Sequence, residues 1–599
     1  MTARTRLALA TIALLPALGC SQLPTDGPIV ETRGSTNVDE VQPLGFDPVP
    51  PQPNASKVDI VNGFLDAMTA WPQRLDVAKQ FLSRETQGSW KPEASTITYL
   101  DVGPVIEGGD TVGVQLVDAE QYDERGAWTG PLATEDQVLD LKVIEEGDEY
   151  RILDPPDAQI VPSDWFADRY RQANVYFFDN TNRILVPEPV FVPRGDQAAS
   201  TLVSRLLAGP AEPRVESTAF PPGTDLDFST PVYDDGIADI RLVGNPPPAS
   251  QEAIEKMVAQ LAWTLRQEQI TALRLTISGV EMSLPGGVSE FDVDSAPEFN
   301  PTGARANYAL YGLRGGLLVS GNRDGLSPVG GPFGVTDRRL RSVAVSIDGA
   351  TAVGVRKDGH RLVAAPVREA STDDPPSGEP PIEQPGLETP RVESTLLEGG
   401  TNLLTPAWDF ADRLWVVDRT STGVEVSYLD RGRTHSIDVP EVSGQNVTSF
   451  LVSRDATRFV AVVRTRKPGV PGAVDELRVG RIEALEEGGE LRIRSTRRIA
   501  LGDTDSLRIK DIAWTSTTTI AVLRTVTEDE LYSVQTVAVD GAPTDTSPTT
   551  ISGPVTGLAG TPVPESRQYV VTPTSLIDIQ TGAETFLEDA DYASLGYVG

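Results

Sequence analysis

Apolar residues recur at helical spacing in the first half of the chain and then give way to alternating, strand-like runs. A first apolar stripe begins just after Ser56 and consists of Val58, Val61, Leu65 and Met68. Intervals of three and four place these residues on one face of a helix, which Asn54 or Ser56 can cap. Strand-like segments follow at 95–102, 111–117, 138–144 and 150–153. Helices followed by an antiparallel sheet predict a small α+β domain over residues 57–165.

Residues 166–300 predict a second small α+β domain. The expected strands are 175–178, 190–192, 237–242 and 273–277, and the expected helices are 198–208 and 252–266. Apolar residues recur at helical spacing in both helices: Leu202, Leu206, Ile254, Val258, Leu261 and Leu265. This spacing is typical of packing, so we expect these side chains to form a core rather than a site.

From residue 301 onward, a repeat of strand, Asp/Gly turn and strand replaces the helical pattern. The clearest copies lie 107 positions apart and match Ser342, Ser346 and Asp348 with Ser449, Ser453 and Asp455. Weaker copies place the equivalent positions, at intervals of 63, 44, 62 and 45 residues, at Ala344, Ala407, Leu451, Ala513 and Leu558. A period of about 44 residues is typical of a β-propeller blade, and a longer interval indicates an insertion, such as the acidic, proline-rich segment 371–390. Residues 301–599 therefore predict a β-propeller of five to seven blades with a closing element at 308–319; an array of β-sandwiches is the alternative.

The first twenty residues have the pattern of an export signal. Arg4 and Arg6 precede an apolar run of 13 residues, Leu7–Gly19. A bilayer-spanning helix takes about 20 residues, so residues 1–19 are interpreted as a cleavable signal peptide. The run ends in Ala17-Leu18-Gly19-Cys20, which resembles a bacterial lipobox. That resemblance implies that Cys20 carries acyl chains such as palmitate; an ordinary secretory signal with a chance cysteine is the alternative.

The segment that follows the signal predicts a tether to the membrane. Residues 20–56 are rich in Pro, Asp and Gly and lack helical or strand periodicity, which is typical of a flexible linker. Beyond Cys20, the sequence contains no run of 18 apolar residues, so no spanning helix is expected. Two or more acyl chains on Cys20 would suffice for stable membrane attachment.

The charge balance limits the possible partners and cofactors. The 599 residues include 51 Lys and Arg against 86 Asp and Glu, which gives a formal net charge of −35. A nucleic-acid binder needs a basic surface, so no nucleic-acid partner is expected. Cys20 is the only cysteine, and His360 and His435 are the only histidines. This excludes intrachain disulfides and zinc sites built from Cys and His, and we predict neither a metal nor a cofactor.

The sequence gives little support to an enzyme. It contains no G-x-S-x-G, H-E-x-x-H or G-x-x-x-x-G-K-[ST] motif, and we predict no catalytic residues. We expect Asp348 and Asp455 to hydrogen-bond the backbone of their turns, and His360 and His435 have no recognisable partner. Three tryptophans are expected to pack within blades rather than to stack on sugars: Trp408, Trp415 and Trp514. Paired carboxylates for glycoside hydrolysis stay open as an alternative, because 86 acids offer many pairs.

The predicted domains and their order resemble known proteins. Helices followed by a curling sheet over 57–165 resemble the NTF2-like fold. Residues 174–278 resemble the GerMN domain of spore-germination and envelope lipoproteins through the segments LVSRLLAGP, FPPGT, DGIADIRL and QLAWTLRQ. A lipobox, two small domains and a C-terminal propeller, in this order, resemble the actinobacterial lipoprotein family LpqB across nearly the whole chain.

The resemblance to the LpqB family implies a function in the cell envelope. It implies a non-catalytic lipoprotein, anchored at the extracytoplasmic face of the cell membrane, that binds the extracytoplasmic domain of the Mtr sensor histidine kinase. There it would regulate a two-component system that governs envelope homeostasis and cell division. Two alternatives stay open: a lipoprotein that binds wall glycans or small ligands in the propeller funnel or the NTF2-like cone, and a propeller glycoside hydrolase. Which residues bind the partner is not predicted.

Overall fold

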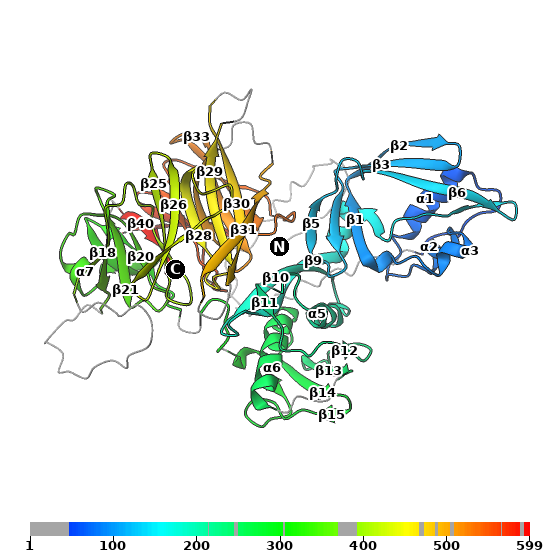
Figure 1. Cartoon of the computed structure of the whole chain (residues 1–599), viewed down its shortest axis with the longest axis horizontal. Coiled ribbons are helices and arrows are strands. Elements are labelled where there is room, and N and C mark those ends of the chain that lie inside the picture. The colour runs from blue at the N-terminus through cyan, green and yellow to red at the C-terminus, as the bar shows by residue number, and fades with distance from the viewer. Residues whose placement is uncertain are drawn as a thin grey trace, which may run out of the picture. The chain divides into compact units, whose positions relative to one another are not determined.

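The computed structural model describes residues 47–599 apart from 214, 245–249, 297, 304–305, 369–391, 467–471, 485–488, 503–507, 545, 565 and 588–591 (Figure 1). Cys20, the signal peptide and most of the predicted tether lie outside the described residues, as does the predicted insertion 371–390. Among the described residues, no helix is both long enough and apolar enough to cross a bilayer.

The first domain begins with a capped helix, α1 (Lys57–Ala67). The cap is Ser56: its Oγ accepts a hydrogen bond from the Asp59 backbone N–H at 3.2 Å, and Asp59 Oδ2 accepts one from the Ser56 backbone N–H at 3.1 Å. This reciprocal pair satisfies two N–H groups at the helix start, which explains why the helix begins there. Two short helices follow, α2 (Asp76–Gln80) and α3 (Arg84–Gln87).

The strands of the first domain form two sheets of four strands, in the orders β5-β4-β1-β8 and β2-β3-β6-β7. Their bounds are β1 Ser95–Tyr99, β2 Asp101–Gly108, β3 Thr111–Val117, β4 Glu120–Asp123, β5 Trp128–Pro131, β6 Val138–Glu146, β7 Glu149–Ile152 and β8 Gln159–Pro162. The prediction of one strand at 95–102 is wrong, because the chain passes from one sheet to the other at the exposed Leu100. The prediction of a purely antiparallel sheet is also wrong, because β8 pairs parallel to β1. The NTF2-like assignment stays a prediction.

The second domain contains the strands and helices that its sequence predicts. Its elements are α4 Ser163–Arg169, β9 Tyr170–Asp179, β10 Leu185–Pro193, α5 Ala198–Leu207, β11 Glu216–Ser217, β12 Asp225–Leu226, β13 Ile237–Val243, α6 Gln251–Leu265, β14 Ala272–Ile277, β15 Val280–Glu281 and β16 Phe291–Asp292. Strands β10, β9 and β11 form one sheet, and β13 and β14 pair in parallel within a second one. As predicted, the apolar faces of α5 and α6 are buried in one core with these strands, and Leu202 and Leu261 are fully buried in it.

The described part of residues 310–599 forms six four-stranded antiparallel sheets, the blades of a β-propeller. Blade 1 is β20 Leu340–Val345, β21 Thr351–Arg356, β22 Arg361–Pro366 and β23 Ser394–Glu398; blade 2 is β24 Ala407–Trp408, β25 Leu414–Thr420, β26 Gly423–Asp430 and β27 Arg433–Ile437; blade 3 is β28 Asn446–Val452, β29 Arg458–Thr465, β30 Val474–Ala484 and β31 Leu491–Ile499. Blade 4 is β32 Ile509–Trp514, β33 Thr519–Thr527, β34 Leu531–Ala538 and β35 Thr549–Ser552; blade 5 is β36 Gly557–Ala559, β37 Tyr569–Val571, β38 Ser575–Asp578 and β39 Glu584–Phe586. Blade 6 is β17 Leu310–Arg314, β18 Leu317–Asn322, β19 Gly325–Pro328 and β40 Tyr592–Gly596, and the short helix α7 (Pro332–Val335) follows β19.

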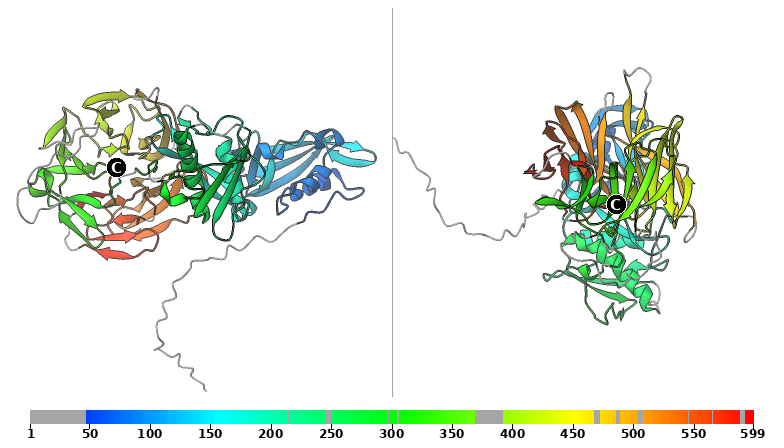
Figure 2. Two further views of the ribbon diagram at one scale, coloured as in Figure 1. Left: turned by 90° about the horizontal axis from the view of Figure 1, so that it is seen from below. Right: turned by 90° about the vertical axis from the view of Figure 1, so that its left-hand side faces the viewer.

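The innermost strands of the blades, which are the first strands of blades 1 to 5 and β40 of blade 6, form a closed ring. Strands β20, β24, β28, β32, β36 and β40 each contact the next, and β40 contacts β20 again. The five repeat positions predicted from the sequence lie in five of these strands: Ala344, Ala407, Leu451, Ala513 and Leu558. Because an array of β-sandwiches would not close in this way, that alternative is wrong. Figure 2 shows the blades around a common axis, with the C-terminus close to it.

Blade 6 joins the two ends of the propeller. Strand β17 pairs with β18 on one side and with the C-terminal β40 on the other. The predicted closing element at 308–319 contains β17. Closure through paired strands leaves the ring without an unpaired edge between its first and last segments.

Candidate functional site

The two aspartates singled out in the sequence repeat hold turns, as predicted. Asp348 Oδ1 accepts hydrogen bonds from Ser346 Oγ at 2.6 Å and from the Ala350 backbone N–H at 2.9 Å. Asp455 Oδ1 accepts the equivalent bonds from Ser453 Oγ at 2.5 Å and from the Thr457 backbone N–H at 2.9 Å. The repeat therefore preserves the turn between the first two strands of a blade.

The three tryptophans pack within the propeller, as predicted. Trp408, Trp415 and Trp514 are 2%, 0% and 7% exposed. The Trp415 indole N–H donates to Asp409 Oδ2 at 2.9 Å, and the Trp514 indole N–H donates to the Val452 carbonyl at 3.1 Å. Buried indoles with these partners stabilise blades and offer no face to a ligand.

The histidines are separate from each other and take part in local contacts. His360 Nδ1 lies 2.6 Å from the Gly400 carbonyl, and the His435 ring stacks on Tyr428 with centroids 4.9 Å apart. In the part of the chain that the structure describes, no group of three or more His, Cys, Asp or Glu side chains is placed to hold a metal ion.

A cluster of charged side chains connects the second domain to blade 3. Arg458 Nη2 donates to Glu188 Oε1 at 2.8 Å and to the Pro187 carbonyl at 2.5 Å, and Arg458 Nη1 lies 3.5 Å from Asp455 Oδ2. Arg481 Nη1 lies 2.8 Å from the same Glu188 oxygen, and Arg481 Nη2 donates a hydrogen bond to Glu216 Oε1. We call Glu188, Glu216, Asp455, Arg458 and Arg481 the junction cluster.

The junction cluster is largely buried, and burial sets its protonation. Burial raises the pKa of Glu188, but the guanidinium groups of Arg481 and Arg458 outweigh burial and lower this pKa to about 2. Burial, together with the negative charge of Glu188, raises the pKa of Glu216 well above its ordinary value. The raised pKa of Glu216 favours the protonated, neutral form of this carboxyl group. With Glu216 protonated, two carboxylates, Glu188 and Asp455, face two guanidinium groups and the charges balance.

A second buried arginine, Arg454, crosses the propeller ring beside this cluster. Its side chain is 3% exposed, and burial lowers its pKa to about 10, so it stays cationic at neutral pH. Its guanidinium donates to the Thr302 and Val598 carbonyls at 3.2 and 2.7 Å and to Thr561 Oγ1 at 3.2 Å. Val598 is the residue before the C-terminus, which lies close to the propeller axis (Figure 2). Arg454 therefore reaches from the β28–β29 turn into the middle of the ring.

Both arginines come from one turn of the repeat. The segment Ser453-Arg454-Asp455-Ala456-Thr457-Arg458 matches Ser346–Thr351 of blade 1, where Ile347 and Thr351 occupy the positions of Arg454 and Arg458. The shared Ser and Asp residues keep the turn geometry in both blades. Blade 3 therefore has arginine at two positions of this shared turn. Arg454 reaches into the ring, and Arg458 binds the second domain.

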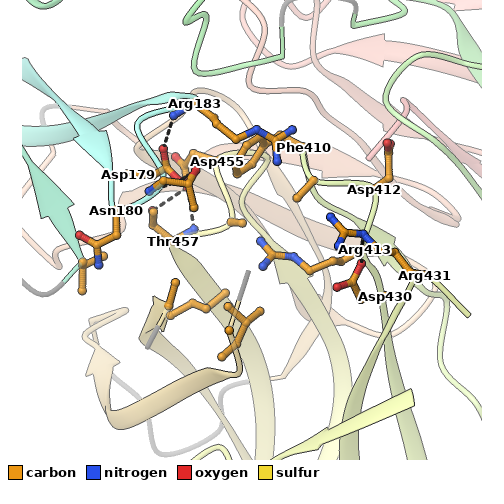
Figure 3. Close-up of a pocket in the computed structure, with 18 residues that line it drawn as sticks. Asp179, Asn180, Arg183, Phe410, Asp412, Arg413, Asp430, Arg431, Asp455 and Thr457 are labelled. Carbon is orange, nitrogen blue, oxygen red and sulfur yellow. Dashed lines mark hydrogen bonds and ion pairs between the residues drawn. The ribbon is translucent and has the colours of Figure 1, made fainter. Parts of the chain in front are cut away.

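A pocket of about 100 Å³ lies at the edge of the junction (Figure 3). It is lined by the β9–β10 turn at residues 179–183 and by propeller loops that include Phe410, Asp412 and Asp455. Burial, with the negative charges of Asp348 and Asp409, raises the pKa of Asp412 to about 6. The Arg183 guanidinium lies 5.5 Å from the Phe410 ring centroid, which adds a cation–π contact between the two domains. The pocket is a polar part of the docking surface and is small for an organic substrate.

Sequence reasoning missed the junction cluster. Arg454 and Arg458 lie within the sequence repeat. The only sequence signal for their role was that blade 3 has arginine at two positions where blade 1 has uncharged residues. The acidic partners, Glu188 and Glu216, are more than 200 residues away in the chain. Nothing in their local sequence distinguishes them from the other acidic residues.

Comparison with known families matches all three described domains. The model described as "Lipoprotein LpqB, N-terminal domain" matches residues 50–167, and the model described as "Lipoprotein LpqB beta-propeller domain" matches 316–378 and 387–580. Together these two models match more than half of the chain. The model described as "Sporulation and spore germination", the Germane domain, matches residues 174–283, which lie within the predicted GerMN-like domain.

Several full-length relatives share this organisation. Lipoprotein LpqB of Thermobifida fusca is 28% identical, over 92% of this chain and 91% of the relative. Lipoprotein LpqB of Rhodococcus jostii is 26% identical, over 92% of this chain and 90% of the relative. Lipoprotein LpqB of Mycobacterium tuberculosis is 24% identical, over 95% of this chain and 93% of the relative.

We predict that Arg458→Met destabilises the docking of the second domain. The change leaves Glu188 with one guanidinium instead of two, and breaking a buried ion pair on one side costs about 3–5 kcal/mol. Equilibrium denaturation measures the loss. The matched control is Arg492→Met, which removes the ion pair of a half-exposed arginine with Glu483 and costs less than about 1 kcal/mol. Equal losses in the two variants would contradict the role assigned to the cluster.

We predict that Glu216→Gln makes the protein less sensitive to rising pH. Since the folded-state pKa of Glu216 is raised, the folded chain holds a proton that the unfolded chain releases, and stability falls as pH rises through that pKa. An amide is neutral like the protonated acid and has nearly the same shape, and its carbonyl accepts the hydrogen bond from Arg481. The stability of the variant relative to the natural protein should therefore increase between about pH 5 and about pH 8.

Denaturation at both pH values tests the prediction for Glu216. The matched control is Glu252→Gln on α6, where the exposed carboxylate pairs with Lys256. Because Lys256 lowers the pKa of Glu252, this carboxyl group is ionised at both pH values, and the stability difference should change little between them. A Glu216→Gln difference that is independent of pH would show that Glu216 is ionised in the folded protein.

Proposed function

Because the chain belongs to the LpqB lipoprotein family, we propose that it is a membrane-anchored, non-catalytic accessory protein of a two-component sensor histidine kinase. It binds the extracytoplasmic domain of the kinase of the Mtr system and regulates its signalling in envelope homeostasis and cell division. The observation that carries this proposal is the similarity to LpqB lipoproteins along at least 90% of the chain and of these relatives.

The anchor part of the proposal rests on the N-terminal sequence. A 13-residue apolar run, Leu7–Gly19, directly precedes Cys20, and the first helix of the described first domain begins at Lys57. The composition of the segment between them predicts a linker long enough to let the domains reach a partner at the membrane surface. The net charge of −35 disfavours electrostatic attraction to an anionic bilayer, so acyl chains on Cys20 supply the attachment.

The junction cluster supports a binding function by fixing a surface. A partner binds more tightly to a surface that is already in its bound arrangement, because less conformational freedom is lost. The cluster and Arg454 bring residues of the second domain and several propeller loops into one defined arrangement. A regulator changes kinase activity only if it binds one kinase state more tightly than another, so a preformed surface suits this role.

Cross-linking in native membranes tests the proposed partner. A photoreactive residue in place of an exposed side chain, such as Phe228, Tyr233 or Val335, samples different faces of the protein. We expect a covalent adduct with the sensor kinase from at least one face, and loss of that adduct when the extracytoplasmic domain of the kinase is deleted. Recovery of no kinase from any face would reject the kinase as the partner.

We predict that Cys20→Ala abolishes acylation and releases the protein from the membrane. The change removes the only thiol, and with it the site for the acyl chains. Metabolic labelling with an alkyne fatty acid and fractionation of membranes measure the two effects. Ser21→Ala, at the next position, is the matched control and should keep both labelling and membrane attachment. Labelling that survives in Cys20→Ala would contradict the lipobox assignment.

A further inference from the structure

Two adjoining pockets lie on the side of the propeller formed by blades 5 and 6. The first, of about 450 Å³, is bordered by Tyr176 and Trp263 of the second domain and by propeller residues that include Gln580. The second, of about 300 Å³, is bordered by Tyr308, Tyr569, Tyr597 and Arg323. Both pockets are lined by Ser566 and Arg567, so they are neighbours along one path. We call the two pockets together the aromatic groove.

The groove concentrates aromatic rings in a chain that has few of them. Aromatic residues are 6% of the sequence, yet five line these two pockets. Three of them, Tyr176, Trp263 and Tyr569, are at most 9% exposed and form the walls. Tyr308 is 61% exposed at the open end, which leaves its ring available to a ligand. The Tyr597 hydroxyl donates to the Arg567 carbonyl at 2.8 Å, which fixes the Tyr597 ring in the wall. At the inner end Trp263 is held by a hydrogen bond from its indole N–H to the Ala296 carbonyl and is covered on one face by Arg266.

The charged groups of the groove occur in balanced pairs. Arg567 Nη1 lies 3.0 Å from Asp578 Oδ2, and Arg323 Nε lies 3.5 Å from Asp324 Oδ1. A guanidinium has five N–H donors, so each arginine keeps donors for a ligand beyond its carboxylate partner. Because each arginine is paired with an aspartate, these pairs give the groove no net positive charge that would favour an anion such as a phosphate. The groove therefore suits a neutral ligand with many hydroxyl groups.

We propose that the aromatic groove binds a neutral oligosaccharide chain. Sugar rings present C–H faces that pack on aromatic rings and hydroxyl groups that pair with planar amide, guanidinium and carboxylate groups. The groove offers these features in Tyr308, Gln580 and the Arg567–Asp578 pair. Its two pockets have the volume of organic-ligand sites, and their adjacency fits a chain better than a single small molecule. The proposal of this binding site does not rest on the proposed kinase partner.

Titration calorimetry with the full-length protein in detergent tests the proposal. The probes are the neutral tetrasaccharides chitotetraose, cellotetraose and maltotetraose, each up to about 10 mM, which covers weak binding. We expect saturable binding of at least one probe, and at least about a fivefold loss of affinity in Tyr308→Ala, which removes an exposed aromatic contact. Gln580→Ala, at a second exposed position, should also weaken binding.

The control variant separates the groove from exposed tyrosine in general. Tyr233→Ala changes a tyrosine that is 46% exposed on the second domain outside the groove, and it should leave the affinity unchanged. Tyr308 and Gln580 are exposed, so folding should persist in these variants, and thermal melting checks this. No binding of any probe, or binding that neither groove variant weakens, would overturn the proposal. Neither result would alter cross-linking to the kinase, so failure here is distinguishable from failure of the proposed function.

Discussion

The arrangement of the second domain on the propeller depends on two guanidinium groups, the buried Arg458 and the partly buried Arg481, that face the carboxyl groups of Glu188 and Glu216. Taking such charges out of water costs several kcal/mol per ion, and only close, well-paired contacts recover that cost. A shifted domain would leave the same charges buried without partners. The junction cluster therefore defines where the second domain docks more than it adds to overall stability.

The turn between β28 and β29 takes part both in the docking of the second domain and in the contacts at the closing end of the propeller ring. Arg454 and Arg458 lie four residues apart between β28 and β29, one directed across the ring toward Val598 and the other toward Glu188. The turn itself is held by Ser453 and Asp455, so the two arginines extend from a fixed frame. Because Val598 follows the closing strand β40, the last strand of the propeller and the docking of the second domain meet at this turn.

The sequence allowed the repeat to be read but not the contacts between domains. Ser346 and Asp348 recur as Ser453 and Asp455 because the two turns have the same hydrogen-bonding needs. This pair located the first strands of two blades, and weaker copies of the strand pattern located three more. The change of sheet at Leu100 was missed because strand-forming residues continue from Ile97 to Val102, and only the adjacent apolar pair Tyr99-Leu100 interrupts the alternation. Glu188 and Glu216 could not be predicted as the partners of Arg458 and Arg481. The sequence contains 86 acidic residues, and only the folded structure shows which of them lie beside these arginines.

The aromatic groove depends on the junction cluster for its inner wall. Tyr176 and Trp263 belong to the second domain, whereas Tyr308, Gln580 and Arg567 belong to the propeller side. The wall stays in place only while the second domain is docked on blade 3. A ligand that contacts both sides of the groove would bind the docked arrangement more tightly than an undocked one. Because such coupling is reciprocal, the bound ligand would stabilise the docked arrangement, and the gain would equal the free energy by which docking favours ligand binding. Occupancy of the groove and the integrity of the junction cluster are thus two coupled properties of one interface between the domains.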